Sequence, residues 1–240
     1  MVPAVVLWLL VLIVVGYVVE WLCTKLFDGK GFHYLLAPGV IVHELSHVLG
    51  CFLVGAEVQK VNLFSEEGGS VEHGKPKLPI VGQVIISLAP IAGCLVVLWG
   101  ISLLFKSPPD PKWALPGSVF PEKLWDGVVG VGMTFWTTVT NTEFRNLRTL
   151  AFGYFLFTFA LATAPSKADL KNAIAGIVAL GLLWALVLWF MRKSPLDGQL
   201  PTASMPLWGT LSMEVLALVV ALAIAIPLVL VAVLVRRCLK

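Results

Sequence analysis

The sequence predicts an all-α polytopic membrane protein with about six transmembrane helices and a small β-hairpin. Of its 240 residues, 58% are hydrophobic and only 13% are charged, and the mean hydropathy is +0.92. An ordinary soluble domain carries about 25% charged residues, so this composition excludes one. We expect a single integral domain over residues 1–240 that passes several times through the cell membrane, contacts the lipid bilayer and binds no nucleic acid.

Apolar stretches long enough to cross a bilayer recur along the whole chain. A helix needs about 20 apolar residues to span the hydrocarbon core. Residues 127–142 are also uncharged but rich in glycine and threonine, which indicates a re-entrant or interfacial helix or a seventh span. We expect the core at about 36–192 and an additional C-terminal span at 209–235. The six predicted spans are residues 2–19, 36–54, 78–105, 149–166, 172–191 and 215–235.

The connection at residues 106–126 is rich in proline and contains Trp113 and Trp125. Proline interrupts helices, and tryptophan is enriched at the interface between membrane and water. We therefore expect an ordered extramembrane loop in this region.

A β-hairpin is predicted at residues 56–74. Val58, Val61 and Leu63 recur among polar neighbours, the turn-forming residues 66–69 follow, and Val71 begins the return strand. The edge of such a hairpin can bind an extended peptide segment by β-augmentation. An ordinary surface hairpin would have the same pattern, so the sequence leaves both interpretations open.

The sequence His-Glu-Leu-Ser-His occupies residues 43–47, in a stretch from 31 to 55 that carries no other charge. In a helix, residues i and i+4 share one face, so His43 and His47 can direct ring nitrogens at one zinc ion. Glu44 lies beside them, where it could act on a water molecule at the ion. Ionisable groups inside a membrane are costly and normally functional. The pattern therefore predicts a membrane-embedded zinc hydrolase; the alternative is two helix histidines satisfied by neighbouring groups.

A longer set of motifs resembles the site-2 protease family of intramembrane zinc metalloproteases. It comprises Pro-Gly-Val-Ile-Val directly before the motif, Gly55, the predicted hairpin, and Ser-Leu-Ala-Pro-Ile-Ala-Gly at residues 87–93. The resemblance covers about residues 36–100 and a later aspartate region. Two histidines and one aspartate bind zinc in that family, and a glutamate is the general base. The resemblance thus implies His43 and His47 as ligands and Glu44 as the base.

Two aspartates are candidates for the third ligand that the resemblance requires. Asp197 lies in Leu-Asp-Gly, which is close to the sequence motif of that family, but it is within a polar linker. Asp169 lies between two predicted spans at the start of a helix. This position favours Asp169 as the ligand, although its neighbours differ from the Leu-Asp-Gly motif. Either residue could instead cap a helix or form a turn. His73 is then the reserve ligand, while His33 is expected at the membrane interface.

The function implied by these residues is metal-assisted hydrolysis of peptide bonds in or near transmembrane segments of membrane proteins. Glu44 would take a proton from water at the zinc and pass it to the leaving amine. A transmembrane helix must unwind before its carbonyl groups become accessible, so we expect the substrate in extended form. Two alternatives remain: a non-catalytic relative that binds membrane-protein segments as a chaperone or regulator, and an ion transporter, although the chain shows no internal repeat.

Overall fold

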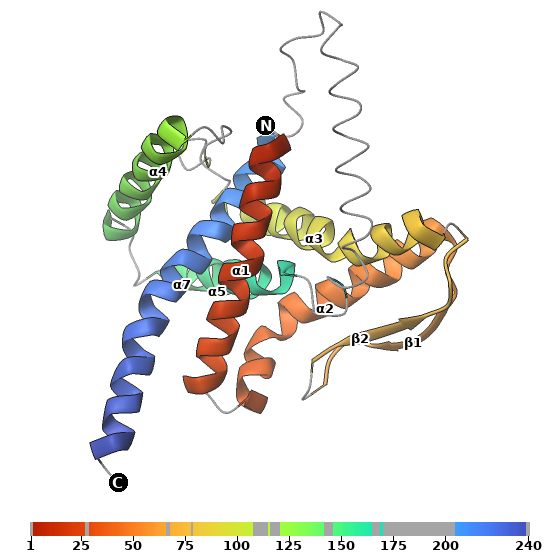
Figure 1. Ribbon diagram of the computed structural model, residues 1–240, viewed down its shortest axis with the longest axis horizontal. Helices are drawn as coiled ribbons and strands as arrows, with labels where there is room; N and C mark the ends of the chain where they lie inside the picture. The colour runs from red at the N-terminus through yellow and green to blue at the C-terminus, as the bar shows by residue number, and fades with distance from the viewer. Residues whose placement is uncertain are drawn as a thin grey trace, which may run out of the picture.

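The computed structural model describes residues 2–26, 29–65, 68–77, 79–107, 115, 121–141, 146–164, 169 and 205–238. Over these residues the chain is mainly helical, with one two-stranded sheet, as predicted. Figure 1 shows α1 and α7 packed together, with α2, α3 and α5 beside them. The elements are α1 (Val2–Leu26), α2 (Gly29–Val54), β1 (Val58–Asn62), β2 (Ser70–His73), α3 (Pro79–Leu104), α4 (Pro121–Asn141), α5 (Leu147–Thr163) and α7 (Met205–Cys238).

Four of the described helices are long and apolar enough to cross a membrane, and α5 is a shorter apolar helix. Large apolar side chains such as Phe52 and Leu53 are exposed on the outside of the bundle, where a lipid environment would cover them. The prediction of an integral, mainly helical membrane protein is confirmed. The predicted span 172–191 lies outside the described residues. The four spanning segments are Leu7–Leu26, Tyr34–Val54, Val81–Leu104 and Trp208–Val231.

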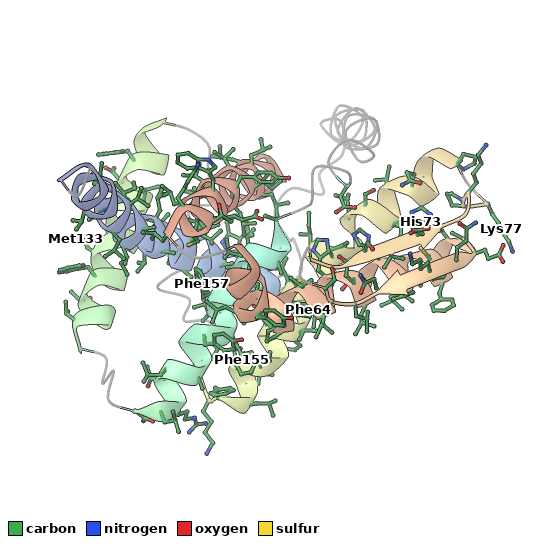
Figure 2. All side chains as sticks on the ribbon, turned by 90° about the horizontal axis from the view of Figure 1, so that it is seen from below. Phe64, His73, Lys77, Met133, Phe155 and Phe157 are labelled. Carbon is green, nitrogen blue, oxygen red and sulfur yellow. The ribbon has the colours of Figure 1, made fainter. Side chains whose placement is uncertain are left out.

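Helix α4 stands apart from the bundle in Figure 1. Trp125, Met133 and Trp136 on it are exposed, and Figure 2 shows Met133 on this separate helix. The helix includes the stretch for which the sequence predicts a re-entrant or interfacial helix. It begins at Pro121, inside the loop predicted for residues 106–126, so the last part of that predicted loop is helical.

One residue of the proline-rich connection, Leu115, is described and buried. Its backbone N–H donates to the Ser212 hydroxyl at 3.0 Å, and the Trp208 indole donates to its carbonyl at 3.1 Å. The connection is therefore held against the start of α7 at this point.

Helix α2 ends in a Schellman motif that directs the chain into the hairpin. Gly55 has a φ of 64°, which glycine adopts without strain. The N–H of Ala56 donates to the carbonyl of Cys51 at 2.9 Å, and the N–H of Gly55 donates to that of Phe52 at 3.3 Å. These bonds satisfy two carbonyl groups that the helix end leaves without partners.

The predicted hairpin is confirmed as an antiparallel pair, with Val61 opposite Val71. It runs back along α2 toward the N-terminal end of that helix, where the Phe64 and Tyr34 rings pack edge to face with centroids 5.3 Å apart. Figure 2 shows Phe64 at one end of the hairpin and His73 at the other. The hairpin therefore passes the middle turns of α2, which carry the His-Glu-Leu-Ser-His motif.

Candidate metal centre

Three of the predicted site residues converge inside the bundle. His43 and His47 lie on one face of α2 and are buried, and the Asp169 carboxylate faces both rings. His43 Nε2 lies 3.5 Å from Asp169 Oδ2, and His47 Nε2 lies 3.2 Å from Asp169 Oδ1. The ligand atoms of the three residues all lie within 4.8 Å of one another. Residues more than 120 positions apart in the chain, on α2 and at Asp169, thus share one site.

The His43 ring is oriented by the C-terminal end of α5. His43 Nδ1 lies 2.6 Å from the carbonyl oxygen of Ala162. That carbonyl belongs to the last turn of α5, where helix carbonyls have no partner within the helix. A carbonyl oxygen can only accept, so Nδ1 of this ring carries a proton and Nε2 faces Asp169.

The His47 ring has the same tautomer, because its Nδ1 donates to the carbonyl of Ile86 at 2.9 Å. Ile86 belongs to α3, which packs against α2 as α5 does. Metal-binding histidines in proteins characteristically donate their second nitrogen to a carbonyl or carboxylate, which fixes the tautomer. Both histidines therefore have the arrangement that a metal ligand needs.

Two glycines allow the neighbouring helices to approach α2 this closely. A Cβ at Gly39 would collide with the carbonyl oxygen of Thr158 on α5. A Cβ at Gly93 of α3 would collide with the Ser46 hydroxyl on α2. These contacts bring the accepting carbonyls of α5 and α3 within reach of the two histidines.

Glu44 is buried beside the histidines and contacts the hairpin. A Cβ at Gly69, one residue before β2, would collide with Glu44 Cγ and come within 2.8 Å of Glu44 Oε1. The backbone at Gly69 therefore passes directly against the Glu44 side chain. The hairpin therefore reaches the motif itself, which the sequence pattern alone could not show.

The donor set fits a zinc ion. Zinc favours two or three histidine nitrogens with a carboxylate oxygen, at bond lengths of about 2.0–2.2 Å. Ligand atoms on a tetrahedron of that size are about 3.3 Å apart, and the two nitrogen–oxygen distances of 3.2 and 3.5 Å match this spacing. The two distances run to different oxygens of the carboxylate, and the ligand atoms spread over up to 4.8 Å, so two imidazoles and one carboxylate can hold a zinc ion once they close around it.

An apolar groove lies on a different face of the motif helix. It has a volume of about 640 Å³ and runs between α2 and α3. Leu45 and Ser46, the two residues inside the motif, contribute to its lining together with Leu49, Ala92 and Val96. The motif helix therefore presents its histidines to the metal centre and its apolar residues to the groove.

The remaining predicted candidates are His73, Asp197 and His33. His73 lies at the end of β2, and its Nδ1 donates to the adjacent Gly74 carbonyl at 2.9 Å, so it is a turn histidine outside the cluster. Asp197 and the side chain of His33 lie outside the described residues. The assignment of Asp169 as the third ligand stays a prediction, now supported by the distances to both histidines.

Sequence reasoning missed a second buried polar group. Glu214 of α7 is fully buried, and its Oε1 accepts from the Thr163 hydroxyl at 3.1 Å, while its Oε2 has no hydrogen-bond partner among the described residues. Thr163 directly follows Ala162, whose carbonyl orients His43. The signal was present in the sequence, since Glu214 lies within an otherwise uncharged stretch from residue 201 to 235.

The N-terminal part of the chain matches a known peptidase family. The family described as Peptidase M50B-like matches residues 2–115. This confirms the resemblance to the site-2 protease-like family. The matched region contains the motif helix, the hairpin and α3, but neither α5 nor Asp169.

Short segments are also similar to curated proteases. The proteins named "Protease HtpX homolog" from Burkholderia mallei (strain SAVP1), Burkholderia pseudomallei (strain 668) and Burkholderia thailandensis are each 37% identical over 67 residues, which is 24% of this chain and 24% of each relative. The chain thus spans about a quarter of the length of these relatives. No solved structure matches. Both comparisons thus relate segments of this chain to peptidases.

Proposed function

Because residues 2–115 match the Peptidase M50B-like family and the described helices make this an integral membrane protein, we propose that it is a zinc metalloendopeptidase. In this proposal it hydrolyses peptide bonds in or near transmembrane segments of membrane proteins. The observation that carries the proposal is the convergence of His43, His47 and Asp169 around one point inside the bundle, with Glu44 beside them.

In the proposed site, His43 and His47 hold zinc through Nε2, and Asp169 holds it through its carboxylate. When bound, zinc would supply a Lewis acid that polarises the scissile carbonyl and lowers the pKa of a water molecule toward neutral pH. The Ala162 and Ile86 carbonyls keep the rings in the tautomer that leaves Nε2 free to bind. The roles of the protein are thus to orient the ligands and to shield them from bulk water.

Glu44 is the proposed general base. It follows His43 directly and precedes His47 by three residues, so its carboxylate is on the same side of α2 as the ligands. It takes a proton from the attacking water and delivers it to the leaving amine as the peptide bond breaks. Burial against Gly69 restricts the positions that its carboxylate can take.

The hairpin supplies the proposed binding surface for the substrate. A two-stranded sheet leaves edge N–H and C=O groups unpaired, and an extended peptide can pair with them. Because Gly69 contacts Glu44, a segment paired along the hairpin would pass close to the base. This explains how a locally unwound transmembrane helix could present one carbonyl to the site.

Metal content tests the ligands. Detergent-purified wild type, Asp169→Ala, Asp197→Ala and Glu44→Gln would be loaded with zinc, dialysed and analysed by mass spectrometry of the metal. We expect about one zinc per chain in wild type, Asp197→Ala and Glu44→Gln, and a loss in Asp169→Ala. Absence of zinc from wild type would overturn the proposal. Loss of zinc in Asp197→Ala alone would show that Asp197, and not Asp169, is the third ligand.

Cleavage tests the activity. Wild type and Glu44→Gln would be reconstituted into liposomes with a mixture of single-span membrane peptides, and new amino termini would be identified by mass spectrometry. We expect cleavage by wild type and a loss of about 10²–10⁴-fold in Glu44→Gln. Equal cleavage by both would overturn the assignment of the base. Zinc binding without any cleavage would favour the non-catalytic alternative.

A further inference from the structure

The carbonyl that orients His47 lies in the middle of a helix, where carbonyls normally have a partner. In an α-helix the carbonyl of residue i accepts from the N–H of residue i+4. For Ile86 that residue is Pro90, which lies inside α3 and is fully buried. Proline has no N–H, so the helix itself leaves the Ile86 carbonyl without its donor.

His47 supplies the missing donor. Its Nδ1 lies 2.9 Å from the Ile86 carbonyl oxygen, and both residues are buried. A buried carbonyl without a partner is costly, so a protein donor is strongly favoured. The bond therefore holds the His47 proton on Nδ1 and directs Nε2 at Asp169, 3.2 Å away.

The packing of α2 against α3 keeps these two groups together. Gly93, one turn beyond Pro90, allows Ser46 of α2 to contact α3 directly. Gly50 of α2 is similarly close to α3, because a Cβ there would lie 3.0 Å from the Ala89 Cβ and 3.1 Å from the Ile86 Cα. The close contacts at Gly50 and Gly93 therefore hold the Ile86 carbonyl next to His47.

We infer that Pro90 is a positioning residue for the metal ligand His47: it releases the Ile86 carbonyl from the helix so that this carbonyl can fix the tautomer of His47. The inference rests on the proposed metal site. His43 obtains its carbonyl in a different way, from the end of α5, so Pro90 acts on one ligand only. An N–H at position 90 would compete with His47 for the Ile86 carbonyl.

Pro90→Ala tests the inference, with Pro227→Ala as the matched control. Pro227 also lies inside a membrane-spanning helix, α7, but it is exposed on the surface of the bundle. Each substitution adds a backbone N–H and removes a helix-breaking ring. Zinc affinity would be measured by competition with a chelator, and the coordination geometry would be followed by the visible spectrum of the cobalt-loaded protein.

We expect zinc affinity to fall about 10–100-fold in Pro90→Ala, as for other groups that orient metal ligands, and to be unchanged in Pro227→Ala. The added helix hydrogen bond opposes the loss of buried volume, so Pro90→Ala should remain folded, and its melting transition would check this. The α-hydroxy analogue of alanine at position 90, which lacks the N–H, should restore the affinity. Unchanged affinity in Pro90→Ala, or an equal loss in Pro227→Ala, would overturn the inference.

A second measurement separates this inference from the metal site itself. The chain has only four histidines, so the tautomer of each can be assigned by two-bond nitrogen–proton correlations on metal-free, histidine-labelled protein, with His47→Gln identifying the signal. We expect Nδ1 of His47 to be fully protonated in wild type, since it donates to the Ile86 carbonyl, and to be partly unprotonated in Pro90→Ala. The same tautomer in both would overturn the role of Pro90 even if zinc binds, and a wild type that binds no zinc would contradict the proposed function alone.

Discussion

The backbone at Gly69 lies against the side chain of Glu44, so closely that a Cβ at Gly69 would collide with Glu44 Cγ. Gly69 belongs to the hairpin and Glu44 to the motif helix. The contact joins the proposed substrate-binding surface to the proposed base. It therefore identifies a position where a single methyl group should affect activity without touching a metal ligand.

Gly69→Ala should lower cleavage by about 100-fold, because displacement of a catalytic group by about 1 Å has effects of this size. Zinc content should stay at the wild-type value, since His43, His47 and Asp169 are unchanged. Gly74→Ala is the control, because a Cβ there would meet its neighbours only at ordinary contact distances of 3.7 Å or more. Wild-type cleavage by Gly69→Ala would argue against a close hairpin at the base.

Gly39→Ala should separate α2 from α5. The added methyl group would overlap the Thr158 carbonyl, and overpacking of this kind costs about 1–3 kcal/mol of stability. Zinc affinity should fall as well, because the Ala162 carbonyl would move away from His43. Gly100→Ala has open space around the new Cβ and should gain about 0.5–1 kcal/mol as a helix substitution. Unfolding in mixed micelles and chelator competition would measure both effects.

Thr163→Val should destabilise the bundle by about 1–3 kcal/mol, because it removes the hydrogen bond to the buried Glu214 carboxyl group. Thr158→Val is the control in the same helix, since the hydroxyl of Thr158 donates to the Phe155 carbonyl one turn away. The double variant Thr163→Val/Glu214→Leu should recover most of the loss, since replacing both partners by apolar groups is often neutral. Additive losses in the double variant would show that the pair is not coupled.

Zinc should stabilise the wild-type fold. At a free zinc concentration 100 times the dissociation constant, ligand binding adds about 2.7 kcal/mol to the free energy of unfolding. Asp169→Ala should show a much smaller rise in melting temperature on addition of zinc, because one of the three ligands is lost. An equal rise in both proteins would indicate that zinc binds elsewhere.

Much of the fold could be predicted from local sequence. The apolar runs, the turn residues at 66–69 and the alternation around Val61 are short-range patterns, and the described spanning helices and the hairpin lie at or near the places where these patterns put them. Helix α7 is only partly predicted: the sequence places an apolar run at 215–235 within a span at 209–235, whereas the helix begins at Met205. A hydropathy pattern treats Glu214 as a boundary because it cannot register the Thr163 hydroxyl that accommodates the carboxyl group.

By itself, the sequence determined that this is a membrane protein whose motif helix places His43 and His47 on one face, because composition and the i, i+4 relation act within single segments. The tertiary structure alone decided which atoms surround that face. The carbonyls that orient the two histidines come from residues 119 and 39 positions away, and the Asp169 carboxylate arrives from beyond α5. Such contacts depend on how the helices pack, and the packing depends on close approaches at Gly39 and Gly93 that no local pattern specifies.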